Sequence, residues 1–281
     1  MHERKKTRLG SGFTLVELLV TITIIAMLAS LLMSAVAAGK SKARSASCLG
    51  NERQLILAWF LYASDFNDAL PYNLGADDIK RGVSKDRYWN WTSSIMSWEL
   101  DADNTNTALL TRGGLGPYTA STPQVYRCPS DFVVSDLQAQ AGWRSRTRSI
   151  SMNAMVGDAG TYSKDGINVN NPEYQQFFKL AQISRASDLF VFVEEHPDSI
   201  NDGYFLNKPD TGEWTDLPAS YHNGGANFAF ADGHMEAHRW LFPSTKPPSK
   251  PDSALLTFRP PASDQGDFDW TMRRTSEEAV R

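Results

Sequence analysis

The sequence predicts an α+β protein in which a long N-terminal helix packs on a small antiparallel β-sheet head with long loops. Three observations support this fold class. Residues 13–39 carry a single charge, Glu17, and no proline occurs before Pro71. A stripe at helical spacing continues this run to about residue 65. Strand patterns come only later, at residues 148–152, 189–194 and 227–240.

The bulk composition fits one sizeable domain with appendages. The chain has 281 residues, of which 41% are hydrophobic, with eight tryptophans and fourteen phenylalanines to fill a core. The formal charge of −4 gives no argument for nucleic-acid binding, so no nucleic-acid partner is expected. Residues 1–12 hold four basic side chains ahead of the apolar run, and the positive-inside rule places such an end in the cytoplasm.

Residues 13–39 are long enough to cross a bilayer as a helix, which takes about 20 residues. A secretory signal peptide is the main alternative, because Ala35-Val36-Ala37 offers a cleavage site. However, the apolar run exceeds the roughly 7–15 residues of a signal-peptide core. An ordinary membrane anchor is the second alternative. Glu17 costs roughly 2.5–3.5 kcal/mol at the centre of a membrane, so a partner is expected, unless its side chain merely reaches the head groups.

The helix is expected to continue beyond the membrane. Cys48, Glu52, Leu55, Trp59 and Tyr62 recur at three- and four-residue steps, which predicts one face packed on a sheet. Turn formers and a proline in residues 65–71 end the helix. The expected organisation is a basic leader at 1–12, a transmembrane helix at 13–39, its continuation at 40–66, a periplasmic or extracellular α+β head at 67–242, and a proline-rich spacer with a C-terminal tail at 243–281.

Local patterns predict several smaller elements of the head. Short helices are expected at 89–98 and 105–112. Residues 227–231 and 234–240 form a predicted hairpin, and Asp232-Gly233 suits a two-residue type I′ turn. Alternation along the first strand places two phenylalanines on one face and two alanines on the other, where a helix could approach closely. The last ten residues are expected to be loose.

Cys48 and Cys128 both follow the membrane segment, in a compartment where disulfides form and persist. A disulfide between them is expected, and it would stabilise the fold by roughly 4 kcal/mol in the chain-entropy model. The alternative is two unpaired buried thiols. The spacing does not resemble a zinc ribbon.

Other polar groups suggest weaker sites. Asp198, Asn201 and Asp202 cluster in a turn and carry oxygen ligands that suit calcium, although Asx-turn chemistry explains the same residues. His234, Glu236 and His238 share a strand face that could hold a transition metal or simply face solvent. His222 and Asp232 could form a catalytic pair, but no nucleophile elbow or P-loop accompanies them, so no enzymatic activity is expected. His222 is expected to bond the loop backbone instead.

The hexapeptide Gly12-Phe13-Thr14-Leu15-Val16-Glu17 resembles the processing site of type IV pilins and type II secretion pseudopilins. The resemblance implies that a prepilin peptidase cuts after Gly12 and methylates the new N-terminal Phe13. It also implies that Glu17 pairs with the amino terminus of a neighbouring subunit. The implied fold is a pilin-like ladle, anchored once in the bacterial inner membrane with its head in the periplasm and assembled with other pilin-like subunits.

A second resemblance lies in the head. His222 stands nine residues before Asp232-Gly233, which resembles the H-x9-DG element of a group of pseudopilin-like proteins. Residues 127–131, with Cys128-Pro129-Ser130, and residues 195–203 resemble other segments of that group. These matches indicate membership rather than mechanism.

The function implied is a structural subunit of a type IV pilus-like or type II secretion pseudopilus fibre. The alternative is a membrane-tethered extracytoplasmic binding module, in which the tryptophan-rich region between Tyr88 and Trp98 would hold a glycan or protein ligand.

Overall fold

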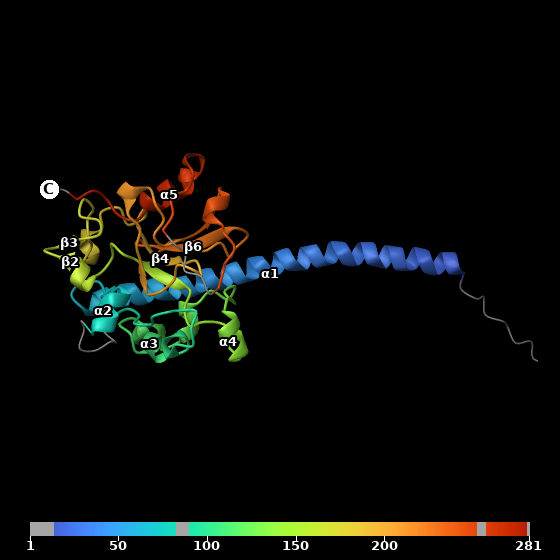
Figure 1. Ribbon diagram of the computed structural model, residues 1–281, viewed down its shortest axis with the longest axis horizontal. Helices are drawn as coiled ribbons and strands as arrows, with labels where there is room; N and C mark the ends of the chain where they lie inside the picture. Colours follow the sequence, from blue (N-terminus) through green and yellow to red (C-terminus); the bar gives the residue numbers. More distant parts are fainter. Residues whose placement is uncertain (1–13, 83–89, 252–256, 280–281) are drawn as a thin grey trace, which may run out of the picture. The chain divides into compact units, whose positions relative to one another are not determined.

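The computed structural model describes residues 14–82, 90–251 and 257–279. The chain divides into two compact units, residues 1–42 and residues 43–281. Helix α1 (Leu15–Asp65) contributes to both of them. Its first part forms the described portion of the N-terminal unit, and its last part belongs to the head (Figure 1). The fold is α+β, as expected.

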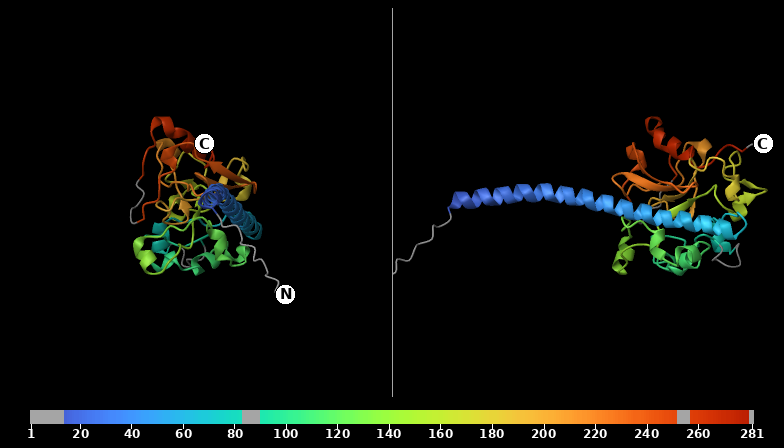
Figure 2. Two further views of the ribbon diagram at one scale, coloured as in Figure 1. Left: turned by 90° about the vertical axis from the view of Figure 1, so that its right-hand side faces the viewer. Right: turned by 180° about the vertical axis from the view of Figure 1, so that it is seen from behind.

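The head segment of α1 is held by the predicted stripe. Cys48, Glu52, Leu55 and Trp59 are fully buried, and Tyr62 is 9% exposed, whereas Leu57 on the opposite face is 52% exposed. This period of three and four residues is what buries one side of a helix. The segment lies between the sheet and the region of α2–α4 in both views of Figure 2.

The helix ends where the sequence predicts. Asn67 and Asp68 have φ values of 53° and 70°, a left-handed conformation that asparagine and aspartate tolerate better than most residues. The Asp68 N–H bonds the Ala63 carbonyl at 2.8 Å, which closes the last turn.

The main sheet has five strands in the order β5-β1-β4-β6-β7. Three of its four pairings are antiparallel, but β1 and β5 are parallel, which differs from the expected all-antiparallel sheet. A short antiparallel pair, β2-β3, lies apart from it. The strands are β1 (Ile150–Asn153), β2 (Ser163–Lys164), β3 (Ile167–Asn168), β4 (Phe190–Glu194), β5 (Tyr204–Phe205), β6 (Gly225–Phe230) and β7 (Met235–Arg239).

The two faces of β6 differ in size, as its alternation predicts. Ala229, with the neighbouring Ala231, joins the core cluster that contains Leu55 and Trp59 of α1. Phe228 and Phe230 lie in a second cluster with Trp240. The small face therefore packs in the same core as the helix, and the large face fills the opposite side of the sheet.

The turn after β6 is not type I′. Of the central pair, Gly233 alone has a positive φ, 90°, whereas a type I′ turn needs two. The Gly233 N–H bonds the Phe230 carbonyl at 2.9 Å, and the Phe230 N–H bonds the His234 carbonyl at 2.9 Å. This pattern fits a type I turn followed by a left-handed glycine. A Cβ on Gly233 would lie 3.3 Å from the Phe60 ring, so the turn also approaches α1 closely.

The region between α1 and β1 is mostly irregular. The helix expected at 89–98 is absent from its described residues 90–98, which run without helix because backbone and side-chain groups bond distant segments. The Trp91 N–H bonds the Tyr72 carbonyl at 2.9 Å, for example, and the Met96 N–H bonds the Asn201 carbonyl at 2.6 Å. The second expected helix is present but shorter. The helices beyond α1 are α2 (Ala76–Arg81), α3 (Ala108–Thr111), α4 (Asp136–Gln140) and α5 (Gln265–Met272).

The C-terminal segment is part of the head rather than a loose tail. Phe268 and Met272 of α5 pack with Trp214 and Leu217 in a buried cluster. The backbone of Ala279 donates to the Glu173 carbonyl at 2.9 Å, which fixes the last described residue. The prediction of loose residues at 272–279 is therefore wrong, because Met272 packs in this cluster and backbone hydrogen bonds hold the residues after it.

Candidate functional site

The described chain begins within the expected processing segment. Gly12 and Phe13 lie outside the described residues, so their roles stay predictions. Thr14 precedes the first residue of α1, and its hydroxyl accepts a 3.2 Å hydrogen bond from the Glu17 N–H. The Glu17 carboxylate accepts bonds from the Thr14 backbone N–H at 2.9 Å and from its hydroxyl at 2.7 Å. These reciprocal bonds form a capping box, in which two groups at the helix start satisfy each other.

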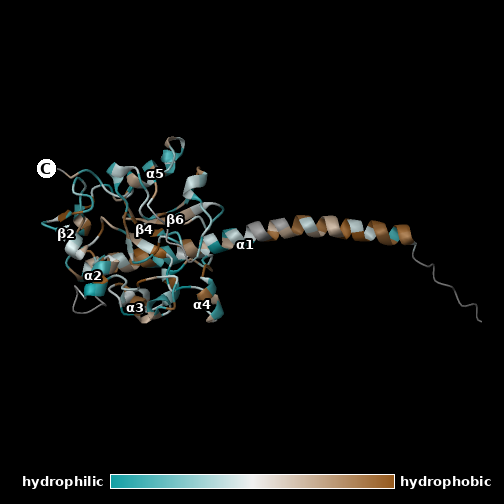
Figure 3. Ribbon diagram, viewed as in Figure 1, coloured by the Kyte–Doolittle hydropathy of each residue, from teal (hydrophilic) through white to brown (hydrophobic). Residues whose placement is uncertain are grey.

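The apolar segment of α1 is exposed along its length in the structure. Residues Leu15–Met33 form a 19-residue stretch that is long and apolar enough to cross a membrane, and none of it is buried in the structure. Figure 3 shows the hydrophobic colouring along this part of the helix. In the described part of the chain it is the one helix that meets these criteria.

Four side chains from distant parts of the head meet in its interior. We call Cys48, Cys128, Glu194 and His222 the buried cysteine–histidine cluster. The ligand-type atoms of all four lie within 4.8 Å of one another. Cys48 comes from α1, Cys128 follows a 3₁₀ turn at Pro123–Tyr126, Glu194 ends β4, and His222 precedes β6.

Short polar contacts connect the buried cysteine–histidine cluster. The Cys48 thiol donates to Glu194 Oε1 at 2.8 Å, and His222 Nε2 lies 2.9 Å from the same oxygen. Cys128 Sγ lies 3.3 Å from His222 Nε2. The side chain of His222 is 6% exposed and that of Glu194 is fully buried. The predicted disulfide is not formed, because both cysteines are free thiols that contact these polar partners.

Burial shapes the charges in and around this cluster. It raises the pKa of the Cys48 thiol well above its ordinary value, and contact with Cys128 and the charge of Glu194 add to the effect. Glu52 stands one helical turn after Cys48, on the same face of α1. Burial, followed by the charges of Glu194 and Cys128, raises the pKa of the Glu52 carboxyl well above its ordinary value. Neither of its oxygens has a hydrogen-bond partner among the described residues.

The pKa of His222 is also raised, but in this residue burial opposes the shift. Burial alone would lower the pKa of its imidazole, but hydrogen bonds to Cys128 and Glu194 and their charges outweigh it and raise the pKa to about 10. The ring was expected to bond the loop backbone, yet only the backbone N–H of His222 does so, to Gly225 at 3.1 Å.

The comparison with protein families bears on the N-terminal segment. Residues 8–33 match the prokaryotic N-terminal methylation motif. The chain carries the prepilin-type cleavage and methylation signature of type IV pilin-like proteins. This match supports processing by a prepilin peptidase and anchoring in a membrane with other pilin-like subunits. Searches of curated proteins and of solved structures found no match.

In the head, the H-x9-DG residues lie at opposite ends of β6. His222 belongs to the buried cysteine–histidine cluster, whereas the Asp232 carboxylate receives the His234 N–H at 3.0 Å in the turn after the strand. His222 and Asp232 therefore do not form a catalytic pair.

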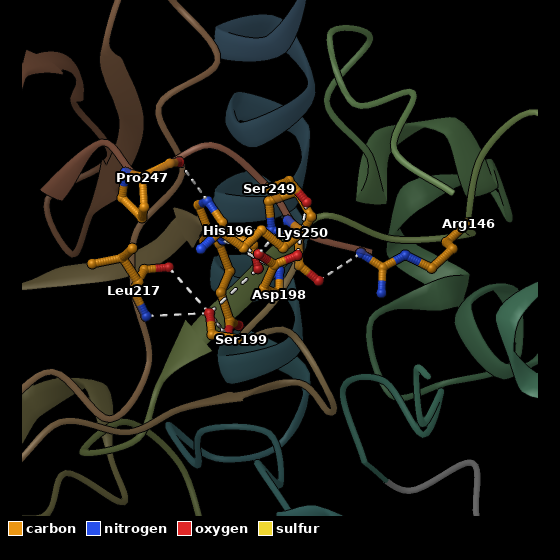
Figure 4. Close-up of polar contacts among 10 residues, drawn as sticks. Arg146, His196, Asp198, Ser199, Leu217, Pro247, Ser249 and Lys250 are labelled. Carbon is orange, nitrogen blue, oxygen red and sulfur yellow. Dashed lines mark hydrogen bonds and ion pairs between the residues drawn. The ribbon is translucent and has the colours of Figure 1, made fainter. Parts of the chain in front are cut away.

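The three residues considered for calcium do not gather into one ligand set. Figure 4 shows Asp198 beside Ser249 and Lys250, whose hydroxyl and backbone N–H bond its two oxygens at 2.7 Å each. Asn201 and Asp202 instead line a separate cavity of about 220 Å³, together with Asp77 and Asp216. The Asp202 carboxylate there accepts N–H bonds from Ala76 at 2.6 Å and Tyr204 at 2.8 Å. The bond from Tyr204 is of the Asx-turn type, whereas the bond from Ala76 joins a distant segment, and calcium stays a prediction.

The row His234, Glu236 and His238, considered above for a transition metal, also makes local contacts. His238 lies 3.2 Å from Glu236 and stacks on Trp270 at 3.6 Å between ring centroids. His234 stacks on Phe230. Within the described residues this row is not among the groups that gather three metal-binding atoms.

Asp216, on the cavity that Asp202 lines, supplies a pH-dependence prediction. Burial, then the charges of Glu195 and Asp202, raise the pKa of its carboxyl well above the ordinary value. Folding therefore takes up a proton, so this stability is present at low pH and lost as the pH rises above about 3.8 toward the folded pKa. Asp216→Asn is expected to stabilise the protein at pH 7, by about 1.4 kcal/mol per unit of pKa difference, and to have little effect near about pH 3. Urea unfolding midpoints at both pH values measure this.

The pH dependence is what distinguishes this effect from a change in packing. An equal effect of Asp216→Asn at both pH values would contradict the prediction. A bound calcium would reverse its sign at pH 7, since the substitution would then remove a ligand charge.

Proposed function

We propose that this chain is a structural, non-catalytic subunit of a type IV pilus-like or type II secretion pseudopilus fibre. A prepilin peptidase cuts it after Gly12 and methylates Phe13, and the mature chain assembles through its N-terminal helix. The observation that carries this proposal is the match of residues 8–33 to the methylation motif. The membrane-length helix that follows, with Glu17 as its single charge, supports it.

The proposed topology follows from charge and length. The basic leader stays in the cytoplasm, residues 13–39 cross the inner membrane once, and the head lies in the periplasm until the subunit enters a fibre. The unit boundary after Lys42 is consistent with this division, because it separates the apolar helix from the packed head.

Mass spectrometry of the mature N-terminus tests the processing step. We expect the chain to begin with N-methylated Phe13 when it is expressed with a prepilin peptidase, and to keep residues 1–12 when that enzyme is absent. Gly12→Leu is expected to block the cut, whereas Ser11→Ala, one residue earlier, serves as the matched control and is expected to be processed. A mature chain that begins at Ala38 would show signal-peptide cleavage instead and would contradict the proposal.

A tethered binding module remains the second candidate, but its proposed surface finds little support. Trp91 is fully buried in the core beside Phe192, with ring centroids 5.3 Å apart. Trp98 lies under the guanidinium of Arg146, 4.0 Å from its ring centroid. Tyr88 and Trp89 lie outside the described residues. A phenotype that survives on a foreign membrane anchor would favour the binding module over the fibre.

The choice between a pilus and a secretion machine needs information from outside the chain. A neighbouring gene pair encoding a secretion ATPase and an outer-membrane secretin would favour type II secretion. Co-purification with other pilin-like subunits would identify the fibre directly.

A further inference from the structure

We propose that the buried cysteine–histidine cluster is a structural zinc site, with Cys48, Cys128, His222 and Glu194 as the four ligands. The proposal concerns the head alone and does not depend on the proposed fibre function.

The ligand types select the metal. Thiolates and imidazoles favour zinc among the common divalent ions, and a carboxylate is an accepted third kind of zinc ligand. Hard ions such as calcium and magnesium prefer oxygen ligands and are disfavoured by two sulfurs. Four protein ligands leave no position open for water or substrate, which is the pattern of a structural rather than a catalytic site.

The geometry is close to what a tetrahedral ion requires. Ligand bonds of 2.0–2.3 Å at tetrahedral angles separate neighbouring ligand atoms by roughly 3.3–3.8 Å. In the structure three of these separations are 2.8, 2.9 and 3.3 Å, and none of the six exceeds 4.8 Å. Among residues 14–82, 90–251 and 257–279, no other histidine, cysteine and carboxylate set gathers in this way.

Glu52 provides an independent indication. It is fully buried, both of its oxygens lack hydrogen-bond partners among the described residues, and it interacts with Glu194 and Cys128. A buried carboxyl without partners is costly. The ligand atoms of a zinc site would be polar partners for that carboxyl, and Glu52 would then act as a positioning residue beside the ligands, as outer-shell carboxylates do in zinc sites.

The backbone around the cluster holds the ligands in place. The Asn227 N–H donates to Glu194 Oε2 at 2.7 Å, which leaves Oε1 toward the sulfurs and the imidazole. The Cys128 N–H donates to the Ser149 hydroxyl at 2.7 Å, and the Ser130 N–H reaches the Cys128 sulfur at 3.3 Å. Zinc would bind two thiolates, a neutral imidazole and a carboxylate, so its entry releases the thiol protons and the Nε2 proton of His222.

The site would assign a role to the histidine of the H-x9-DG element. Zinc would join α1, the Cys-Pro-Ser loop, the end of β4 and the entry to β6 in one bond set. It would also keep both thiols reduced in an oxidising compartment, since a metal-bound thiolate is not available for a disulfide.

The test uses the full-length protein, purified in detergent without chelators. Elemental analysis is expected to find one zinc per chain. After removal of the metal under reducing conditions, cobalt(II) is expected to produce thiolate-to-cobalt charge-transfer absorption and the ligand-field bands of a tetrahedral ion. Zinc added in competition should bleach both.

Two ligand variants and one variant of the positioning residue test the assignment. Cys128→Ser and His222→Asn are expected to weaken zinc binding by more than about 100-fold, beyond the range of an outer-shell change, and Glu52→Gln by about 10- to 100-fold. His234→Asn is the matched control, because that histidine is 43% exposed in the turn after β6 and should bind zinc as the wild type does.

Two results would overturn the proposal. One is wild-type protein with two titratable thiols that takes up no zinc and gives no thiolate-to-cobalt absorption. The other is a Cys48–Cys128 disulfide in protein purified without reductant and no metal after reduction. Because the cobalt spectrum is recorded on the wild type, the proposal can fail even if the ligand variants do not fold.

Discussion

Glu17→Ala is expected to be processed normally and to enter fibres at a small fraction of the wild-type level. The substitution removes the single charge of the apolar segment and with it the proposed partner of a neighbouring subunit's new amino terminus. The proposed ion pair in the low-dielectric core is then lost, because no other residue of the apolar segment carries a charge that could form it. Immunoblots of membrane and sheared-fibre fractions, with N-terminal mass spectrometry, measure both steps.

The capping box makes two control variants necessary. Glu17→Gln keeps a side chain that can serve in a capping box but removes the charge. Thr14→Ala keeps the charge but removes the hydroxyl that bonds Glu17, at a cost of about 1 kcal/mol in helix stability. If charge pairing drives assembly, Glu17→Gln fails and Thr14→Ala assembles. The reverse result would show that the local cap, rather than the charge, is what Glu17 provides.

Trp59→Ala is expected to destabilise the head by about 3–5 kcal/mol, a range typical of large aromatic side chains removed from a core. Trp59 is fully buried on α1 in the cluster that joins the helix to the sheet, and its ring meets Phe60 edge-on with centroids 5.2 Å apart. Circular dichroism during thermal or urea unfolding of the detergent-solubilised protein measures the loss.

Leu57→Ala is the matched control for Trp59→Ala. It lies two residues away on the same helix but is 52% exposed, so its unfolding midpoint should stay close to that of the wild type. Equal losses for the two variants would contradict the packing of this face against the sheet.

Local patterns predicted the parts of the fold that local physics decides. The stripe from Cys48 to Tyr62 is buried as its spacing predicts, and α1 ends at Asp65, where turn formers follow. The hydrophobic run that became β4, and the alternation in β1 and β6, were also visible, because burial on one or both faces of a strand leaves a short-range pattern.

The rest of the fold depends on contacts between residues far apart in the chain. The parallel pairing of Met152 with Tyr204 joins two short segments that no local pattern relates. The 90–98 region is rich in tryptophan, yet Trp91 is held in an irregular conformation by Asn73, whose side-chain oxygen accepts its indole N–H at 3.0 Å.

The candidate sites show the same division. The prepilin-type segment is contiguous, so the sequence alone identified it. The buried cysteine–histidine cluster draws on positions 48, 128, 194 and 222, and no spacing rule links them. A signal was nevertheless present, since Glu52 occupies an apolar stripe and Glu194 ends a hydrophobic strand. An acidic residue at a core position indicates a polar partner. The two cysteines and His222 are side chains that could serve as that partner.

The buried stripe of α1 also has a mechanical consequence. In a fibre built on α1, a pulling force along the helix axis would reach the head through contacts distributed over about four turns, from Cys48 to Tyr62. Such a force loads many side-chain contacts at once, so these contacts must break together rather than one after another. The Asn51 side-chain amide bonds the carbonyls of Gln124 and Arg127 at 3.2 and 3.0 Å. These two hydrogen bonds lie near the end of the buried stripe at which the force would enter the head. We therefore expect the head to withstand a much larger pulling force along α1 than its small sheet alone would suggest.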